Sequence, residues 1–317
     1  MILFLLRRLA YAVPIALAVS AVCFALVFLA PGDPLSSVLP ADASAELVEQ
    51  LKAQYGFDKP VPVQFAKWVG RALQGDLGTS IATGRPVASE IRHAIANTFV
   101  LAVFACAVGF TLGVSFGAVA GYFQSRWIDR VVTALAVAGV SVPHYWLGMV
   151  LVIVFSVLWN ALPAMGMGSS GSADWAWDWE HIRFVVLPAV TLSVIPTSIL
   201  ARTVRALVAD ILSREFVIAL KAKGLGERRI FLHVVKNAAP TAIAVMGVQL
   251  GYLLGGSILV ETVFSWPGTG FLLNTAIFQR DVPLLQGTIL FLALFFVALN
   301  LVVDLVQPLL DPRIQRT

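Results

Sequence analysis

Few side chains in this sequence stand in a spacing that supports chemistry. Gly113-Val-Ser-Phe-Gly117 matches the pattern G-x-S-x-G, in which Ser115 would be the nucleophile of a hydrolase. That pattern needs a strand–turn–helix setting with histidine and acid partners, whereas Ser115 lies in the middle of a long apolar run. We interpret the match as accidental. An intramembrane enzyme remains a rival hypothesis, but it lacks a paired nucleophile and base.

Motifs for metal, redox or nucleotide chemistry are absent from the sequence. It contains no H-E-x-x-H, no C-x-x-C and no G-x-x-x-x-G-K-[ST]. The two cysteines, Cys23 and Cys106, lie in different apolar runs, which is typical of small buried residues. The four histidines are scattered and form no cluster: His93, His144, His181 and His233. We therefore predict no catalytic, metal-binding or cofactor-binding residue in this chain.

Ionisable residues inside apolar runs are the remaining candidates, because they commonly mark ion or substrate pathways in membranes. Asp304 lies about two turns from the end of the last run, where pairing with Arg202 or Arg205 would explain it without a pathway. Glu261, at the end of the fifth run, is open between an interfacial and a pathway role. Ion-driven transporters usually carry more such charge and often show internal repeats. We expect the energy for transport to come from elsewhere, with a stand-alone secondary transporter or channel as the alternative.

The composition places these residues in a membrane protein. Of 317 residues, 59% are hydrophobic and only 13% are charged, whereas about a quarter of the residues in soluble domains are charged. A helical span needs roughly 20 mostly apolar residues. Six runs meet that length: 9–30, 98–122, 131–158, 184–207, 241–264 and 284–306. We predict an all-α integral membrane protein with six transmembrane helices in one domain, residues 1–317.

The basic residues set the orientation of these spans. With the N-terminus inside, 14 of the 22 Lys and Arg residues are cytoplasmic, and only Arg183 and Arg280 fall in short outer loops. We therefore expect both termini in the cytoplasm. Arg7 and Arg8 then act as an orientation signal before a retained first helix. Since the net charge of +4 comes from loops beside the spans, a nucleic-acid partner is not expected.

The outer loops carry the only substantial polar regions. Residues 31–97 are expected to form an extracytoplasmic cap, with a helix from Asp42 to about Tyr55, a second over 63–73 and a third over 87–96. A packing lid and a surface for an extracytoplasmic partner are both open. In the next outer loop, alternating tryptophans favour an aromatic belt at the membrane interface: Trp175, Trp177 and Trp179.

Small residues spaced four apart predict close contacts between membrane helices. The spacing lets two helix backbones approach because no large side chain separates them. The candidates for helix packing are Gly113, Gly117, Gly121, Gly251 and Gly255.

The cytoplasmic loop 208–240 is longer and more regular than a simple connection requires. Its central part reads EFVIALKAKGLGERRIFLHVVKNAAP over residues 215–240. This predicts a short helix, a break at Gly224, a second charged helix, and Pro240 opening the fifth span. This loop is charged and regular, and it lies on the predicted cytoplasmic side, where soluble proteins can reach it. We therefore interpret it as a docking element.

The same loop resembles the EAA loop of permease subunits of binding-protein-dependent ABC importers. Ala219 and Gly224 match at the family spacing, while Ile218 replaces the Glu, Leu220 replaces the second Ala, and Pro240 lies further from the glycine. Motifs over nearly the whole chain resemble the dipeptide/oligopeptide/nickel permeases, in particular dipeptide permease B-like subunits. They are LRRLAYAVPI, LAPGDP, GDLGTS, SVPHYWLG, GGSILVETVFSWPGTG and DLVQPLLDPRI.

This resemblance implies a type I ABC importer permease fold in the bacterial inner membrane. It also implies a second homologous permease, two cytoplasmic ATPase subunits that carry ATP and Mg, and an extracytoplasmic solute-binding protein. The implied substrates are di- or oligopeptides, with nickel chelates, glutathione, opines and oligosaccharides as alternatives; the substrate-binding residues stay unknown. The residues expected to couple to the ATPases are Glu215, Phe216, Ala219, Leu220, Lys221, Ala222, Lys223, Gly224, Leu225, Glu227 and Arg228.

Overall fold

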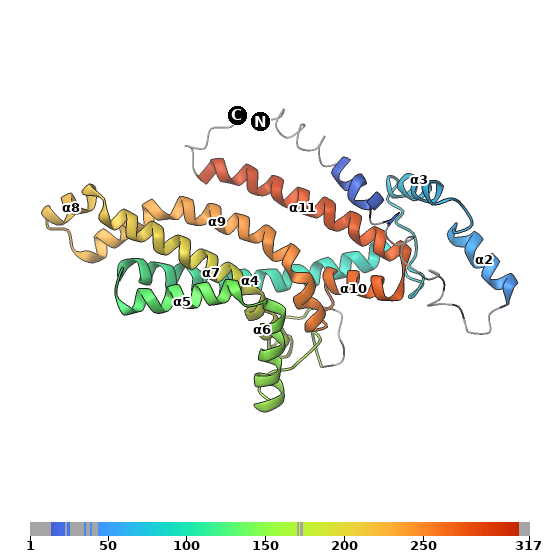
Figure 1. Ribbon diagram of the computed structural model, residues 1–317, viewed down its shortest axis with the longest axis horizontal. Helices are drawn as coiled ribbons and strands as arrows, with labels where there is room; N and C mark the ends of the chain where they lie inside the picture. The colour runs from blue at the N-terminus through green and yellow to red at the C-terminus, as the bar shows by residue number, and fades with distance from the viewer. Residues whose placement is uncertain are drawn as a thin grey trace. The chain divides into compact units, whose positions relative to one another are not determined.

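The computed structural model describes residues 14–22, 24–25, 35, 39, 44–169, 171 and 174–310. The regular elements in these ranges are helices (Figure 1). They are α2 (Ala45–Tyr55), α3 (Val61–Ala72), α4 (Val87–Tyr122), α5 (Trp127–Ser141), α6 (His144–Leu151), η1 (Val152–Leu158), α7 (Trp179–Ser213), α8 (Glu215–Ala222), α9 (Glu227–Val263), α10 (Thr269–Gln279) and α11 (Val282–Leu310). The chain divides into two compact units, residues 1–98 with 267–298 and residues 99–266 with 299–317.

Long apolar helices account for part of the predicted spans. Within the described residues, α4, α7 and the first 27 residues of α9 are long and apolar enough to cross a membrane. The bent pair of α5 with α6 and η1 makes a fourth if it is counted as one span. Half of the predicted first span, 9–30, is described, namely residues 14–22 and 24–25, and this part is helical. The number six and the cytoplasmic termini therefore stay predictions.

The predicted span 131–158 is not one straight helix. It consists of α5 and of α6 with η1, and the two parts are bent by 102°. Proline disfavours the α conformation in the residue before it. Val142, which precedes Pro143, accordingly takes extended angles of φ −82° and ψ 127°. The chain continues after the bend as α6 and then as the wider π-helical turn η1.

Helix α7 is the centre of the larger unit, where it packs against α5, α6 and α9. Asp178 begins the helix by accepting a 2.8 Å hydrogen bond from the backbone N–H of His181, and this bond holds the pKa of the Asp178 carboxyl below its usual range. Helix α4 approaches it through glycines: a Cβ added at Gly117 would lie 2.6 Å from the carbonyl oxygen of Ala201. Gly113 and Gly121 are similarly close to α7. The absence of side chains on this face of α4 permits the close approach.

In the smaller unit, a buried carboxylate joins the GDLGTS segment to the start of α11. Asp281 is fully buried and accepts hydrogen bonds from the Ser80 hydroxyl at 2.5 Å and from the Ala82 N–H at 3.0 Å. Its second oxygen accepts from the Leu284 N–H at 3.0 Å. The motif therefore has a structural role in this unit, because it satisfies a charge that would otherwise be buried alone.

The cap follows the predicted pattern up to α4. Helix α2 ends at Tyr55, and Gly56 after it has φ +77°, a conformation that favours glycine. The predicted stretch 87–96 is the first part of α4, which continues into the predicted second span. Helix α10 was not predicted. Its sequence TGFLLNTAIFQ is apolar but half the length of a span, so it was interpreted as outer loop.

Candidate coupling site

Helix α8 is a short, separate helix between two long ones. Arg214 takes extended angles and separates α7 from α8, and Gly224 has φ +76° after α8. The Gly224 N–H donates to the Lys221 carbonyl at 2.9 Å, which closes the turn. Figure 1 shows α8 at the shared end of α7 and α9. Both neighbours contact it, so α8 is held by two long helices of the same unit.

One face of α8 is anchored and the other is open. Val217 is only 1% exposed and attaches the helix to the unit. Ile218 is 63% exposed, and Phe216 and Ala219 are also exposed, while Leu220 is half-buried. Exposed apolar side chains gathered on the open side of a short helix fit a protein-contact site. Ile218 was missing from the predicted coupling residues, since the sequence showed it only as a departure from the EAA pattern.

The charged residues around α8 are exposed and weakly paired. Lys221 Nζ lies 3.7 Å from Glu227 Oε1, and Glu227 Oε2 accepts a 3.2 Å hydrogen bond from the Tyr122 hydroxyl. Exposed pairs of this kind contribute at most about 1 kcal/mol. Lys223 and Arg228 form no ion pair with another described residue. Both are therefore available at the rim of the apolar face.

The segment after α8 differs from the prediction. We expected a charged helix ending near Pro240 and a separate span beyond it, but α9 runs without interruption from Glu227 to Val263 with Pro240 inside. A proline inside a helix removes one hydrogen bond and is tolerated at the cost of a local distortion. The charged part and the apolar part are thus one helix, which continues from the turn at Gly224 into the candidate span.

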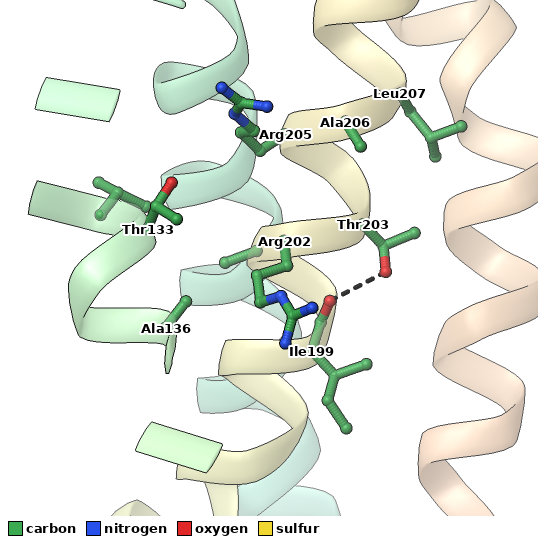
Figure 2. A pocket seen from close by; sticks show the side chains of 10 residues that line it. Thr133, Ala136, Ile199, Arg202, Thr203, Arg205, Ala206 and Leu207 are labelled. Carbon is green, nitrogen blue, oxygen red and sulfur yellow. Dashed lines mark hydrogen bonds between the residues drawn. The ribbon is translucent and has the colours of Figure 1, made fainter. Parts of the chain in front are cut away.

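A second site lies between α5 and α7, where a pocket of about 670 Å³ opens (Figure 2). Beside it, Arg205 donates to both oxygens of Asp129, from Nε at 2.9 Å and from Nη2 at 2.7 Å. Asp129 is 4% exposed and also accepts from the Ser125 N–H. Arg205 is thus engaged by Asp129, while pairing of Asp304 with Arg202 or Arg205 stays a prediction. The side chain of Asp304 lies outside the described residues.

The other residues predicted from the sequence lie outside these two sites. Gly255 has open space, since an added Cβ would meet nothing within 4 Å, so packing by the pair Gly251 and Gly255 stays a prediction. Glu261 is fully buried, and its role remains open. Trp175 packs against the core of the larger unit beside Trp266, with ring centroids 6.1 Å apart, whereas Trp177 and Trp179 are exposed, so the aromatic belt stays a prediction.

Long apolar helices and an exposed helix held at the end of two of them define a multi-pass membrane protein with a surface that a soluble partner can reach. The chain belongs to the family of binding-protein-dependent transport system inner membrane components, whose model matches residues 113–316. The model of the N-terminal region of these membrane components matches residues 1–102. The resemblance stated from the motifs is confirmed.

Individual relatives match over nearly the full length. The chain is 37% identical over 316 residues to the glutathione transport system permease protein GsiC of Escherichia coli O6:H1, covering 99% of each chain. The proteins of the same name from Salmonella choleraesuis and Escherichia coli K12 are 37% and 36% identical, again over 99% of each chain. The chain is therefore a permease subunit of an ABC importer in the bacterial inner membrane and not an enzyme. The family implies ATPase and solute-binding partners.

Proposed function

We propose that this permease imports a short peptide of the glutathione class. The relatives at 36–37% identity over 99% of their length carry glutathione in their names, which supports glutathione over the di- or oligopeptides expected first. Glutathione is itself a tripeptide. The two hypotheses therefore differ only in which peptide bond and which side chains of the substrate the importer recognises. Di- and oligopeptides remain the second candidate because the motifs that carry the resemblance do not specify a substrate.

The resemblance also supplies the proposed partner subunits of the importer. A second, homologous permease forms the other half of the translocation path, and two ATPase subunits bind the cytoplasmic face. ATP and Mg bind to those subunits, and this chain needs no cofactor of its own. A solute-binding protein delivers the substrate from outside.

The observation that carries the coupling proposal is the construction of α8. Val217 anchors the helix while Phe216, Ile218 and Ala219 are presented to the cytoplasm, so an ATPase cleft has an apolar face to bind. The predicted basic residues Lys221, Lys223 and Arg228 lie around that face. Since α8 contacts α7 and α9, its displacement on ATP binding is passed to two membrane helices as a rigid lever.

Substrate class is tested by transport. The permease pair, the ATPases and the binding protein are reconstituted in liposomes, and ATP-dependent uptake of labelled glutathione is measured with unlabelled glutathione or dialanine as competitor. Saturable uptake that glutathione blocks and dialanine does not supports the proposal. Uptake of labelled dialanine without uptake of glutathione would favour the second candidate and overturn the first.

A further inference from the structure

We propose that Arg202 in the pocket between α5 and α7 binds a carboxylate group of the transported substrate. This inference rests on the proposed function, because a peptide of either candidate class carries at least one carboxylate at neutral pH. It adds the residue in this chain that recognises that group.

Arg202, one of the 14 basic residues on the cytoplasmic side of the predicted spans, lies within a helix long and apolar enough to cross a membrane and not at the end of that helix. It precedes Ser213, the last residue of α7, by 11 positions, which corresponds to about 16 Å along a helix. It is also about one and a half turns inside the apolar run 184–207. Its side chain is exposed on the helix, whereas neighbouring Ala201 and Val204 are buried against the rest of the unit. A cation at such a depth faces water or an anion and not lipid.

The direction of the side chain argues against escape to the cytoplasmic surface. Arginines near span ends often extend their guanidinium groups to the interface. In Figure 2 the Arg202 side chain runs back toward the Ile199 turn, away from the cytoplasmic end of α7, while the Arg205 side chain runs toward the other end. The charge of Arg202 is thus directed into the membrane-spanning part of the pocket.

Within the part of the chain that the structure describes, the charges beside the pocket leave Arg202 as the cation without an ion-pair partner. Arg205 also lines the pocket, but its guanidinium group is neutralised by two hydrogen bonds to Asp129. Among the residues that the structure describes, none forms an ion pair with Arg202. The positive potential in the pocket therefore comes from Arg202, and it selects an anion.

The lining and the size of the pocket favour a small solute. Its volume of about 670 Å³ lies in the range of small-molecule sites, roughly 300–1,000 Å³. Hydroxyl groups of Thr133 and Thr203 lie among small and apolar side chains, but both are engaged within the chain: Thr133 donates to Asp129 at 3.3 Å and Thr203 donates to the Ile199 carbonyl. A planar guanidinium group matches the two oxygens of a carboxylate. Because the pocket is not an enclosed cavity, the occupant can enter and leave, as a transported molecule must.

The first test measures transport in the reconstituted importer with Arg202→Gln. Removal of a charged hydrogen-bond donor should lower uptake of labelled glutathione at least about tenfold, while ATP hydrolysis stimulated by the loaded binding protein is retained. Arg202→Lys should keep part of the uptake. Arg130→Gln is the matched control, because Arg130 is exposed on α5 and does not line the pocket. Unchanged uptake in Arg202→Gln overturns the inference.

The second test measures whether the pocket prefers anionic over cationic reagents. In the assembled importer with Cys23 and Cys106 replaced, Ala206→Cys is labelled with an anionic and a cationic water-soluble thiol reagent. The anionic reagent should react faster, the advantage should disappear in Arg202→Gln, and glutathione should slow the reaction. No labelling, or labelling without charge preference, overturns the inference. So does loss of the partner permease on purification of Arg202→Gln, since Arg202 would then pair with a carboxylate of that subunit.

The two proposals fail in different ways. If the wild-type importer takes up neither glutathione nor dialanine, the proposed substrate class is wrong whatever Arg202 does. If wild-type uptake is normal and the ratio of Arg202→Gln to wild type stays near one, only the role of Arg202 is wrong.

Discussion

Arg205 and Asp129 form a two-point contact that fastens α5 to α7, with N–O distances of 2.9 and 2.7 Å. Asp129 is nearly inaccessible, and the Arg205 side chain is one-third exposed. The pair removes one cation from the pocket beside it and leaves Arg202 as the group that attracts an anion.

Removal of the Asp129 carboxylate should destabilise the permease. Asp129→Ala leaves the Arg205 charge unpaired and the Ser125 N–H without its acceptor. We expect a loss of about 2 kcal/mol in the free energy of unfolding, less than for a fully buried pair because Arg205 is partly exposed. Thermal unfolding of the purified permease pair measures it. Asp210→Ala, which breaks an exposed pair with Arg214, is the control and should change stability by less than about 0.5 kcal/mol. Equal effects would contradict the account.

The same Gly→Ala change should affect stability differently at Gly117, on the glycine face of α4, and at Gly255 on α9. Gly117→Ala places a Cβ 2.6 Å from the Ala201 carbonyl oxygen, so α4 and α7 must separate and stability should fall by about 1–3 kcal/mol. Gly255→Ala meets open space in this chain and should be neutral or slightly stabilising. Unfolding temperatures of the two variants in the same detergent test this. A Gly117→Ala protein as stable as the wild type would show that the contact is looser than described.

The buried Asp281 should be required for the smaller unit. Asp281→Ala removes the acceptor of the Ser80 hydroxyl and of two backbone N–H groups, for which we expect a loss of about 2–4 kcal/mol. Proteolysis of the outer cap in membranes gives the readout, with faster cleavage expected in the variant. Asp76→Ala, which loses one exposed hydrogen bond to Gly78, should be cleaved at nearly the wild-type rate. The same cleavage rate in both variants would argue against a structural role for Asp281.

The turn after α8 should be sensitive to backbone chemistry. Gly224→Pro cannot adopt φ +76° and lacks the N–H that donates to Lys221, and Ala219→Arg places a charge on the exposed face. Both variants should insert in the membrane but lose at least about tenfold in recovery of ATPase subunits on affinity purification. Leu73→Arg, at an exposed site on the outer cap, is the control. Normal recovery with Gly224→Pro and Ala219→Arg would remove α8 from the coupling site.

Helix positions were largely predictable because apolar runs of sufficient length leave few alternatives. The runs 98–122 and 184–207 lie within α4 and α7, and the Gly224 break appears where the sequence places it. The bend at Pro143 and the continuity of α9 through Pro240 were not predicted. The two prolines give the same local signal, and only packing decides whether a helix breaks or continues.

The contacts that build the pocket could not be predicted from the chain alone. Asp129 and Arg205 are 76 positions apart, and Arg202 on the same helix is an equally good partner by sequence. Their pairing depends on the rotation of α5 and α7, which periodicity does not fix in uniformly apolar helices. Ile218 was passed over for a related reason, since burial of Val217 determines which face of α8 is open.

The most direct test of the account is cross-linking from Ile218 in the native membrane. Ile218→Cys, in a chain with Cys23 and Cys106 replaced, is treated with a short thiol-to-amine cross-linker, and the products are identified by mass spectrometry. We predict a major product with an ATPase subunit whose yield changes when ATP is added, and no such product from Leu73→Cys on the outer cap. Cross-links from Ile218→Cys to lipid or to this chain alone, while the complex still hydrolyses ATP, would contradict coupling through α8.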